Sequence, residues 1–153
     1  MAKMKIEVGV HNPILRKVST EVKKFDSSLK KFVKDMKVAL KKANGLGLAA
    51  PQIGHNVRVF LMVLDYESSK QKVIAVINPK IKSFSTETYI EEEGCLSIPG
   101  VYAKVERPKA VEVSFKDENN IQYNMKLSDL NAREFQHEYD HLDGVLFVDK
   151  LAE

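Results

Sequence analysis

The sequence predicts an α+β domain in which two helices flank a long run of strands. Apolar residues recur at helical spacing in two segments, one at about residues 27–43 and one at about residues 128–142. Between them, residues 57–127 consist mostly of short β-branched and apolar runs separated by turn residues. Because strands and helices do not alternate along the chain, we expect antiparallel pairing of the strands rather than a parallel βαβ sheet.

The first helix is predicted from five apolar positions, which are Leu29, Phe32, Val33, Met36 and Leu40. Asp26 or Ser27 is placed to cap its start, and Gly45 follows its end. The lysines of this segment lie mostly off the apolar stripe, which indicates a solvated helix face rather than an RNA-binding surface.

The strands are predicted from composition and from the turn residues that bound them. Residues 57–64 and 73–77 are the most apolar runs, and we expect the second to stop at Asn78 and Pro79. Residues 109–115 and 121–127 flank a polar turn and predict a hairpin. Three shorter pieces are also expected to be strands, namely residues 81–84, 88–92 and 101–105.

The second helix is predicted over about residues 128–142. Its apolar contacts are Leu130, Phe135, Tyr139 and Leu142, and Gly144 is placed to stop it. Only a short tail follows, so we expect residues 1–153 to form one domain without an extended C-terminal tail.

Composition excludes several classes of protein. The net charge of +3 is mild, and no nucleic-acid-binding motif is visible. A single cysteine excludes an internal disulfide and suits a reducing compartment. The longest apolar run, residues 59–64, is too short to span a membrane, and the N-terminus does not resemble a signal peptide. We therefore expect a cytoplasmic protein, with an organelle or the cytosol of a viral host as alternatives.

Residues 137–141 form an HExxH motif on the second predicted helix. Residues four apart share a helix face, so His137 and His141 can bind one metal ion. Glu138 lies beside that metal, where it can handle the protons of a bound water. The motif therefore predicts a mononuclear metal hydrolase.

A catalytic metal site of this kind needs a third protein ligand and an open fourth position. Too few residues follow His141 for another helix with a ligand, so the third ligand is expected upstream. The candidates other than carboxylates are His11, His55 and Cys95. Cys95 is the only cysteine, and Gly94 beside it allows the backbone to pass close to another element.

Three segments resemble the motifs of peptide deformylases, in that family's order and with its usual separations. They are residues 45–54 (GLGLAAPQIG), residues 93–97 (EGCLS) and residues 136–144 (QHEYDHLDG). The resemblance implies antiparallel β-sheets packed around a central helix that carries HExxH, with an N-terminal helix. It also implies that the chain is a catalytic domain that removes the formyl group from N-formylmethionine of nascent polypeptides and releases formate.

The resemblance also implies roles for individual residues. Cys95, His137 and His141 would bind the metal, and Glu138 would take a proton from the metal-bound water and deliver it to the leaving amine. The Gln52 side chain and the Leu96 backbone N–H would hold the formyl oxygen as it becomes an oxyanion.

Other residues would bind the substrate or support the site. Leu46 and Gly47 would form main-chain hydrogen bonds with the substrate. Glu93 and Arg107 would pair and brace the site, with Gly45 as structural support.

The resemblance further implies one divalent metal ion, with Fe(II) expected in vivo and zinc, nickel or cobalt as alternatives. The partners would be N-formylmethionyl peptides of nascent chains. Proximity to the ribosome is compatible with this function, but no C-terminal extension supports it.

Two residues at the substrate cleft stand out. Glu134 lies three residues before His137, near the expected pocket for the methionine side chain, where related sequences usually have an apolar or small residue. We hypothesise that it alters the preference for the first side chain. Tyr102 follows Pro99 and Gly100, and is either a substrate contact or an exposed strand aromatic.

Two other readings of the sequence remain. One is a small metallopeptidase or another amidase with the same HExxH chemistry. The other is an inactive metal-binding domain, against which the presence of both Glu138 and Gln52 argues.

Overall fold

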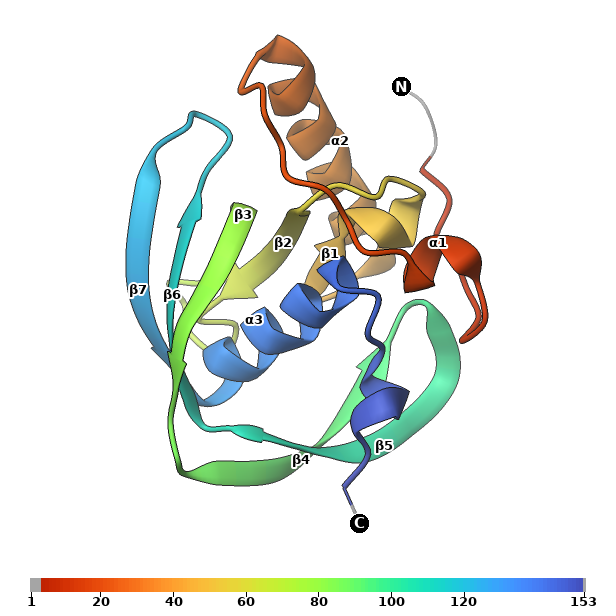
Figure 1. Ribbon diagram of the computed structural model, residues 1–153, viewed down its shortest axis with the longest axis vertical. Coiled ribbons are helices and arrows are strands. Elements are labelled where there is room, and N and C mark those ends of the chain that lie inside the picture. Colours follow the sequence, from red (N-terminus) through yellow and green to blue (C-terminus); the bar gives the residue numbers. More distant parts are fainter. Residues whose placement is uncertain (1–3, 153) are drawn as a thin grey trace.

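A five-stranded antiparallel sheet forms the main layer of the computed structural model, which describes residues 4–152 (Figure 1). The strand order is β1-β2-β3-β6-β7, and every neighbouring pair is antiparallel. Their bounds are β1 Gly47–Ala49, β2 Val59–Leu64, β3 Lys72–Phe84, β6 Ala110–Lys116 and β7 Gln122–Ser128. The predicted hairpin is confirmed as β6 and β7, and β1 is left at an edge of the sheet.

A second, two-stranded antiparallel sheet consists of β4 (Thr88–Cys95) and β5 (Ile98–Pro108). These strands are longer than predicted, because they pair with each other along most of their length. They curve beneath α3 (Asp129–Leu142), so that this helix lies between the two sheets (Figure 1). The predicted α+β class with antiparallel sheets is confirmed.

The two long helices cover opposite faces of the five-stranded sheet. Phe60 and Met62 of β2 share a buried cluster with Phe135 of α3. Val59 and Leu61, which alternate with them, pack in a second buried cluster with residues of α2 (Ser27–Ala43). Because both faces of β2 are covered, its sequence is a continuous apolar run rather than an alternating one.

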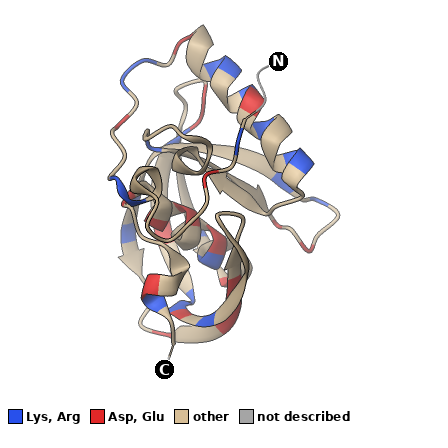
Figure 2. Cartoon of the chain, turned by 90° about the vertical axis from the view of Figure 1, so that its right-hand side faces the viewer, with Lys and Arg blue, Asp and Glu red and all other residues tan. Residues whose placement is uncertain are grey.

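The predicted bounds of α2 are confirmed. Asp26 caps its start by accepting a hydrogen bond from the Leu29 N–H at 3.1 Å. Asn44, in the left-handed conformation with φ 55°, caps its end. The lysines of the helix lie on its outer side (Figure 2).

The predicted stop at Asn78 and Pro79 is wrong, because β3 continues through both residues to Phe84. Its pairing with β6 shifts register between Ile77 and Lys80, so Pro79 falls where the ladder is interrupted and its missing N–H is tolerated. Asn78 adopts φ 51° and forms two side-chain hydrogen bonds, each 2.8 Å, with the backbone of Val22. The bulge thereby fastens the segment before α2 to the sheet.

Three short helical elements complete the chain, namely α1 (Pro13–Arg16), η1 (Ala50–Ile53) and η2 (Phe147–Lys150). A third buried cluster joins α1 and η2 to β5, and it contains Leu15, Ile98, Val105, Leu146 and Phe147. Within residues 4–152, no helix is both long and apolar enough to cross a membrane.

Candidate active site

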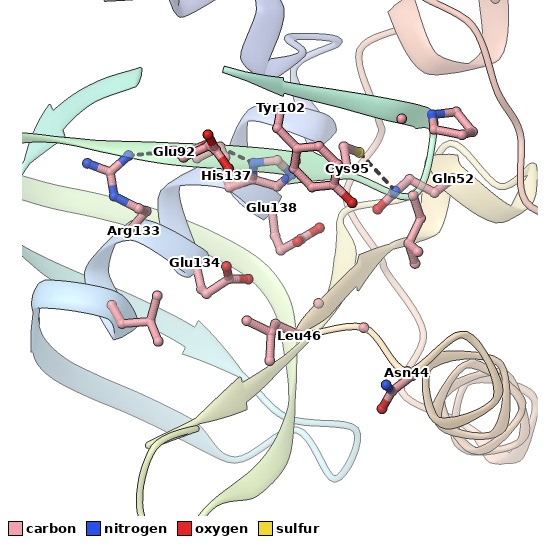
Figure 3. Close-up of a pocket in the computed structure, with 18 residues that line it drawn as sticks. Asn44, Leu46, Gln52, Glu92, Cys95, Tyr102, Arg133, Glu134, His137 and Glu138 are labelled. Atoms are coloured by element: carbon pink, nitrogen blue, oxygen red, sulfur yellow. Dashed lines mark hydrogen bonds and ion pairs between the residues drawn. The ribbon is translucent and has the colours of Figure 1, made fainter. Parts of the chain in front are cut away.

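A cavity of about 550 Å³ opens between the edge of β1, the β4–β5 turn and one face of α3. Figure 3 shows side chains from all three elements directed toward it. The cavity brings together the three sequence segments that resembled one family, although they lie far apart along the chain. Most of the predicted site residues line this cavity.

The candidate metal ligands are Cys95, His137 and His141. Their ligand atoms all lie within 4.8 Å of one another, and Cys95 Sγ is 3.4 Å from His141 Nε2. The geometry selects Cys95 from the upstream candidates, since the group contains neither His11 nor His55. One thiolate and two imidazoles are a donor set that suits zinc and other borderline transition metals.

Glu93 orients His137 from behind the metal ligands. Its Oε1 lies 2.9 Å from His137 Nδ1, which leaves the other ring nitrogen of His137 free to bind a metal. Arg107 and Arg133 both donate hydrogen bonds to the same carboxylate. Burial by itself raises the pKa of Glu93, but hydrogen bonds from His137 and Arg107 hold it well below its usual range. Glu93 is therefore a permanent anion.

The protonation of the two histidines is linked to metal binding. Burial lowers the pKa of His141 well below its usual value, so its ring is neutral, as metal binding requires. Burial also disfavours charge on His137, but hydrogen bonds with Cys95 and Glu93 raise its pKa well above the usual value. Cys95, His137 and His141 would hold a metal in their deprotonated forms, so metal binding there would depend on pH.

Glu138 lies against the metal ligands and against β1. Burial raises its pKa to about 8, and its Oε1 atom is buried without a hydrogen-bond partner in the described part of the chain. A Cβ on Gly47 would lie only 2.8 Å from the Glu138 carboxyl carbon, so a larger residue there would force the Glu138 side chain to shift. A buried carboxyl group with a free oxygen and a pKa near neutrality is suited to proton transfer.

Gln52 lies beside Cys95 and is held by η1. Its Oε1 accepts a hydrogen bond from the Ala49 N–H at 2.9 Å, which fixes the orientation of the amide. Its Nε2 donates to Ser97 Oγ at 3.1 Å and lies 3.5 Å from Cys95 Sγ. Leu96 and Ser97 form the tight turn between β4 and β5, directly after Cys95, and Leu96 lines the cavity.

The free edge of β1 forms one wall of the cavity. The Leu46 carbonyl accepts a hydrogen bond from the Val63 N–H of β2 at 2.8 Å, so it is engaged inside the sheet. Backbone groups of successive strand residues point to opposite sides, and those of Gly47 therefore point away from β2. Of the two expected main-chain contacts, Gly47 is the better placed, while Leu46 lines the cavity.

Glu134, Tyr102 and Gly45 also line the cavity. Tyr102 is 68% exposed, and its ring lies over Gly94, where a Cβ would come within 2.6 Å of it. Tyr102 is therefore an exposed residue of a strand that also lines the cavity. Gly45 is closely packed, since its Cβ would be 3.3 Å from both Leu40 and Leu96 side chains. The structural role of Gly45 stays a prediction.

Sequence reasoning missed three contributors to the site. Arg133 is 3% exposed, pairs with Glu93 and donates to the Val105 carbonyl. Asp140 accepts a hydrogen bond from Arg107 at 2.9 Å, and Ser97 binds Gln52. The available signal was the position of Arg133, four residues before His137 and therefore on the same helix face.

Comparison with known proteins identifies the family. Residues 4–153 match the family model described as polypeptide deformylase. The chain belongs to the polypeptide deformylase family. It is 43% identical to the chloroplastic/mitochondrial peptide deformylase 1B of Arabidopsis thaliana over 142 residues, which are 93% of this chain and 52% of that protein. It is 41% identical to the peptide deformylase of a Synechocystis strain over 138 residues, which are 90% of this chain and 74% of that protein.

Solved structures agree with this assignment. The crystal structure of the Thermotoga maritima peptide deformylase matches with a TM-score of 0.93 and 38% identity, with each chain covered completely. A peptide deformylase from Synechococcus elongatus in complex with actinonin matches with a TM-score of 0.90 and 40% identity, covering 100% of this chain and 84% of the other.

Family membership confirms the predicted class of enzyme, a metal-dependent hydrolase that removes the N-formyl group of nascent polypeptides. It also favours this class over the metallopeptidase and the inactive domain.

Proposed function

We propose that this chain releases formate from N-formylmethionine at the start of nascent polypeptides. The observation that carries the proposal is the position of Glu138, with its free oxygen, beside the donor atoms of Cys95, His137 and His141. This group lies at the end of a cavity whose wall is the unpaired edge of a strand. Such an edge suits an extended peptide substrate.

The residues present fit a divalent metal held by Cys95, His137 and His141. When bound, the metal supplies a Lewis acid and lowers the pKa of water from ~16 to about 7. We propose Fe(II) as the resident metal, as the family resemblance implies, with zinc, nickel and cobalt as substitutes that the same donors accept. Protein purified without oxygen should contain iron, and the metal-free protein should regain activity with Fe(II). Full activity with zinc and none with Fe(II) would contradict this choice.

Glu138 is proposed as the general base and then the general acid. It accepts a proton from the attacking water and delivers it to the amine nitrogen as the C–N bond breaks. A pKa of about 8 allows both steps near neutral pH, because the carboxyl group gives and takes a proton with little cost.

Gln52 and the Leu96 backbone N–H are proposed to stabilise the oxyanion. The Gln52 amide is already oriented by Ala49 and Ser97, so its N–H groups need little rearrangement when charge develops on the formyl oxygen. Gly47 is proposed to bind the substrate backbone along the edge of β1, with Leu46 and Tyr102 beside it. Glu93 and Arg107 are positioning residues that act through His137.

The test is formate release from formyl-Met-Ala-Ser, with acetyl-Met-Ala-Ser and unmodified Met-Ala-Ser as comparison substrates. We expect formate from the formylated peptide and no cleavage of the other two. Cleavage of the Met–Ala bond would instead indicate a metallopeptidase. A protein that binds metal but cleaves none of the peptides would be an inactive binding domain. Glu91→Gln, an exposed change on β4, is the matched control and should retain full activity.

The partners proposed for the chain are formylated nascent peptides. A cytoplasmic or organellar location stays a prediction, and association with the ribosome is untested. Cosedimentation of the purified protein with ribosomes checks the second of these.

A further inference from the structure

The cavity carries more acidic than basic side chains. Four acidic residues line it, namely Glu92, Glu93, Glu134 and Glu138, and its basic lining residues are Arg133 and His137. The two terminal nitrogens of Arg133 donate to Glu93, to the Val105 carbonyl and to the Tyr89 carbonyl, whereas its Nε is buried without a partner in the described part of the chain. Among residues 4–152, its ion pair is with Glu93, and it forms none with Glu92, Glu134 or Glu138.

Glu134 is the acidic residue that the proposed reaction does not use. It lies four residues before Glu138 on α3, so the two side chains share a helix face with Cβ atoms about 5–6 Å apart. Figure 3 shows the Glu134 carboxylate between Glu138 and Leu46, directed into the cavity. A substrate with its formyl group at Glu138 has its first side chain only a few bonds away, and this side chain can reach Glu134.

The Glu134 carboxylate has no hydrogen bond or ion pair with any residue between 4 and 152, although the residue is half-buried. The contrast with Glu93 is informative, because Glu93 also lies next to the cavity and is surrounded by Arg107, Arg133 and His137. A half-buried carboxylate without a partner in the protein is left to bind a group on a ligand.

We propose that Glu134 is a specificity-determining residue that favours substrates whose first side chain ends in a positive charge or a hydrogen-bond donor. Leu46 and Leu130 line the same cavity and contact the aliphatic part of such a side chain, as they would contact methionine. Glu134 binds its far end. The inference rests on the proposed function and names the substrate class that this chain accepts beyond formylmethionine.

The experiment compares formyl-Lys-Ala-Ser with formyl-norleucine-Ala-Ser, since norleucine has the aliphatic chain of lysine without the amino group. Glu134→Gln removes the charge at constant size, and Glu134→Leu makes the position apolar. The ratio of kcat/KM for the lysine peptide to that for the norleucine peptide should fall about tenfold or more in both variants. The loss should appear as a higher KM for the lysine peptide at nearly constant kcat, because the contact is equally strong in the ground and transition states.

The variants also distinguish this role from a structural one. Glu134→Leu should hydrolyse the norleucine peptide at least as well as the wild type, which a misfolded protein cannot do. Equal ratios in the wild type and both variants would overturn the inference while leaving the deformylase assignment intact. An equal fall of the ratio in Glu92→Gln would also overturn it, since the general charge of the cavity would then be responsible. Failure of the wild type to release formate from every peptide would overturn the proposed function and this inference together.

Discussion

The two buried faces of α3 differ in what surrounds them. One face contributes Ala132, Phe135 and Leu142 to the apolar cluster beneath the five-stranded sheet. The other face is also buried, but it carries Arg133, Gln136, His137, Glu138 and His141. The apolar face needs only shape and volume, whereas each polar group on the other face needs a partner of its own.

The comparison shows that the apolar face stabilises the fold and that the polar face carries the groups proposed for catalysis. Burial of the apolar face stabilises the fold without any need for hydrogen-bond partners. On the polar face, Gln136 and His137 have partners, but Arg133 Nε, Glu138 Oε1 and His141 Nδ1 are buried without any in the described structure. Groups left unpaired in this way reduce stability, and the proposed reaction accounts for Glu138.

The largest effect on stability is expected from the apolar face. Phe135→Ala removes a fully buried ring that packs edge-to-face on Phe60 with centroids 5.1 Å apart. We expect unfolding to require about 3–5 kcal/mol less free energy, because a cavity remains in the core. Urea denaturation measures the change. The folded fraction should retain its kcat for formyl-Met-Ala-Ser, and a matching loss of kcat would mean that the two faces are not independent.

A catalytic effect of similar size is expected at Gln52. Gln52→Leu removes the N–H donors proposed to bind the oxyanion and should lower kcat about 10²–10³-fold. Ser97→Ala removes only one hydrogen-bond partner of the Gln52 amide and should cost much less. If the two variants lost activity equally, the site would depend on the Gln52–Ser97 contact rather than on the donors to substrate.

Arg107→Met tests the network that supports the polar face. Glu93 keeps Arg133 and His137 as partners, so the destabilisation should lie near the lower end of the range for a broken buried pair, about 3 kcal/mol. Thermal unfolding and metal content measured together check this prediction. A variant with unchanged stability and unchanged metal content would show that Arg107 does not hold Glu93 in place.

The smallest effect is expected on the solvent side of α2. Lys31 pairs with Asp35 at 2.8 Å, but the lysine side chain is 71% exposed. Lys31→Ala should change the free energy of unfolding by about 0.5 kcal/mol or less, because water and salt screen the pair. A loss comparable to that of Arg107→Met would remove the distinction between buried and exposed pairs.

The sequence predicted those parts of the fold that depend on local patterns. The apolar stripe of α2 and its capping Asp26 set its bounds correctly, and the continuous run in β2 indicated a strand. The path of β3 through Pro79 could not be predicted, since it depends on a bulge and on contacts between Asn78 and Val22. These contacts join residues that are distant in the chain.

The candidate site was predictable to a similar degree. Spacing placed His137 and His141 on one helix face with Glu138 beside them, and the family motifs added Cys95 and Gln52. The roles of Arg133 and Asp140 were missed because a charged residue on a helix is usually solvated, and only the fold brings Glu93 and Arg107 against them. The free carboxylate of Glu134 likewise depends on which basic groups are already engaged.

Glu138→Gln tests most directly whether the buried polar face of α3 is present for catalysis rather than stability. Formate release from formyl-Met-Ala-Ser, bound metal and Tm should be measured on the same wild-type and variant preparations. We expect the rate to fall about 10²–10⁴-fold with metal retained, because general acid–base catalysis is lost. The Tm should not fall, since the variant removes a carboxyl group that is costly to bury. Full activity, or a large fall in Tm with loss of the metal, would contradict the account.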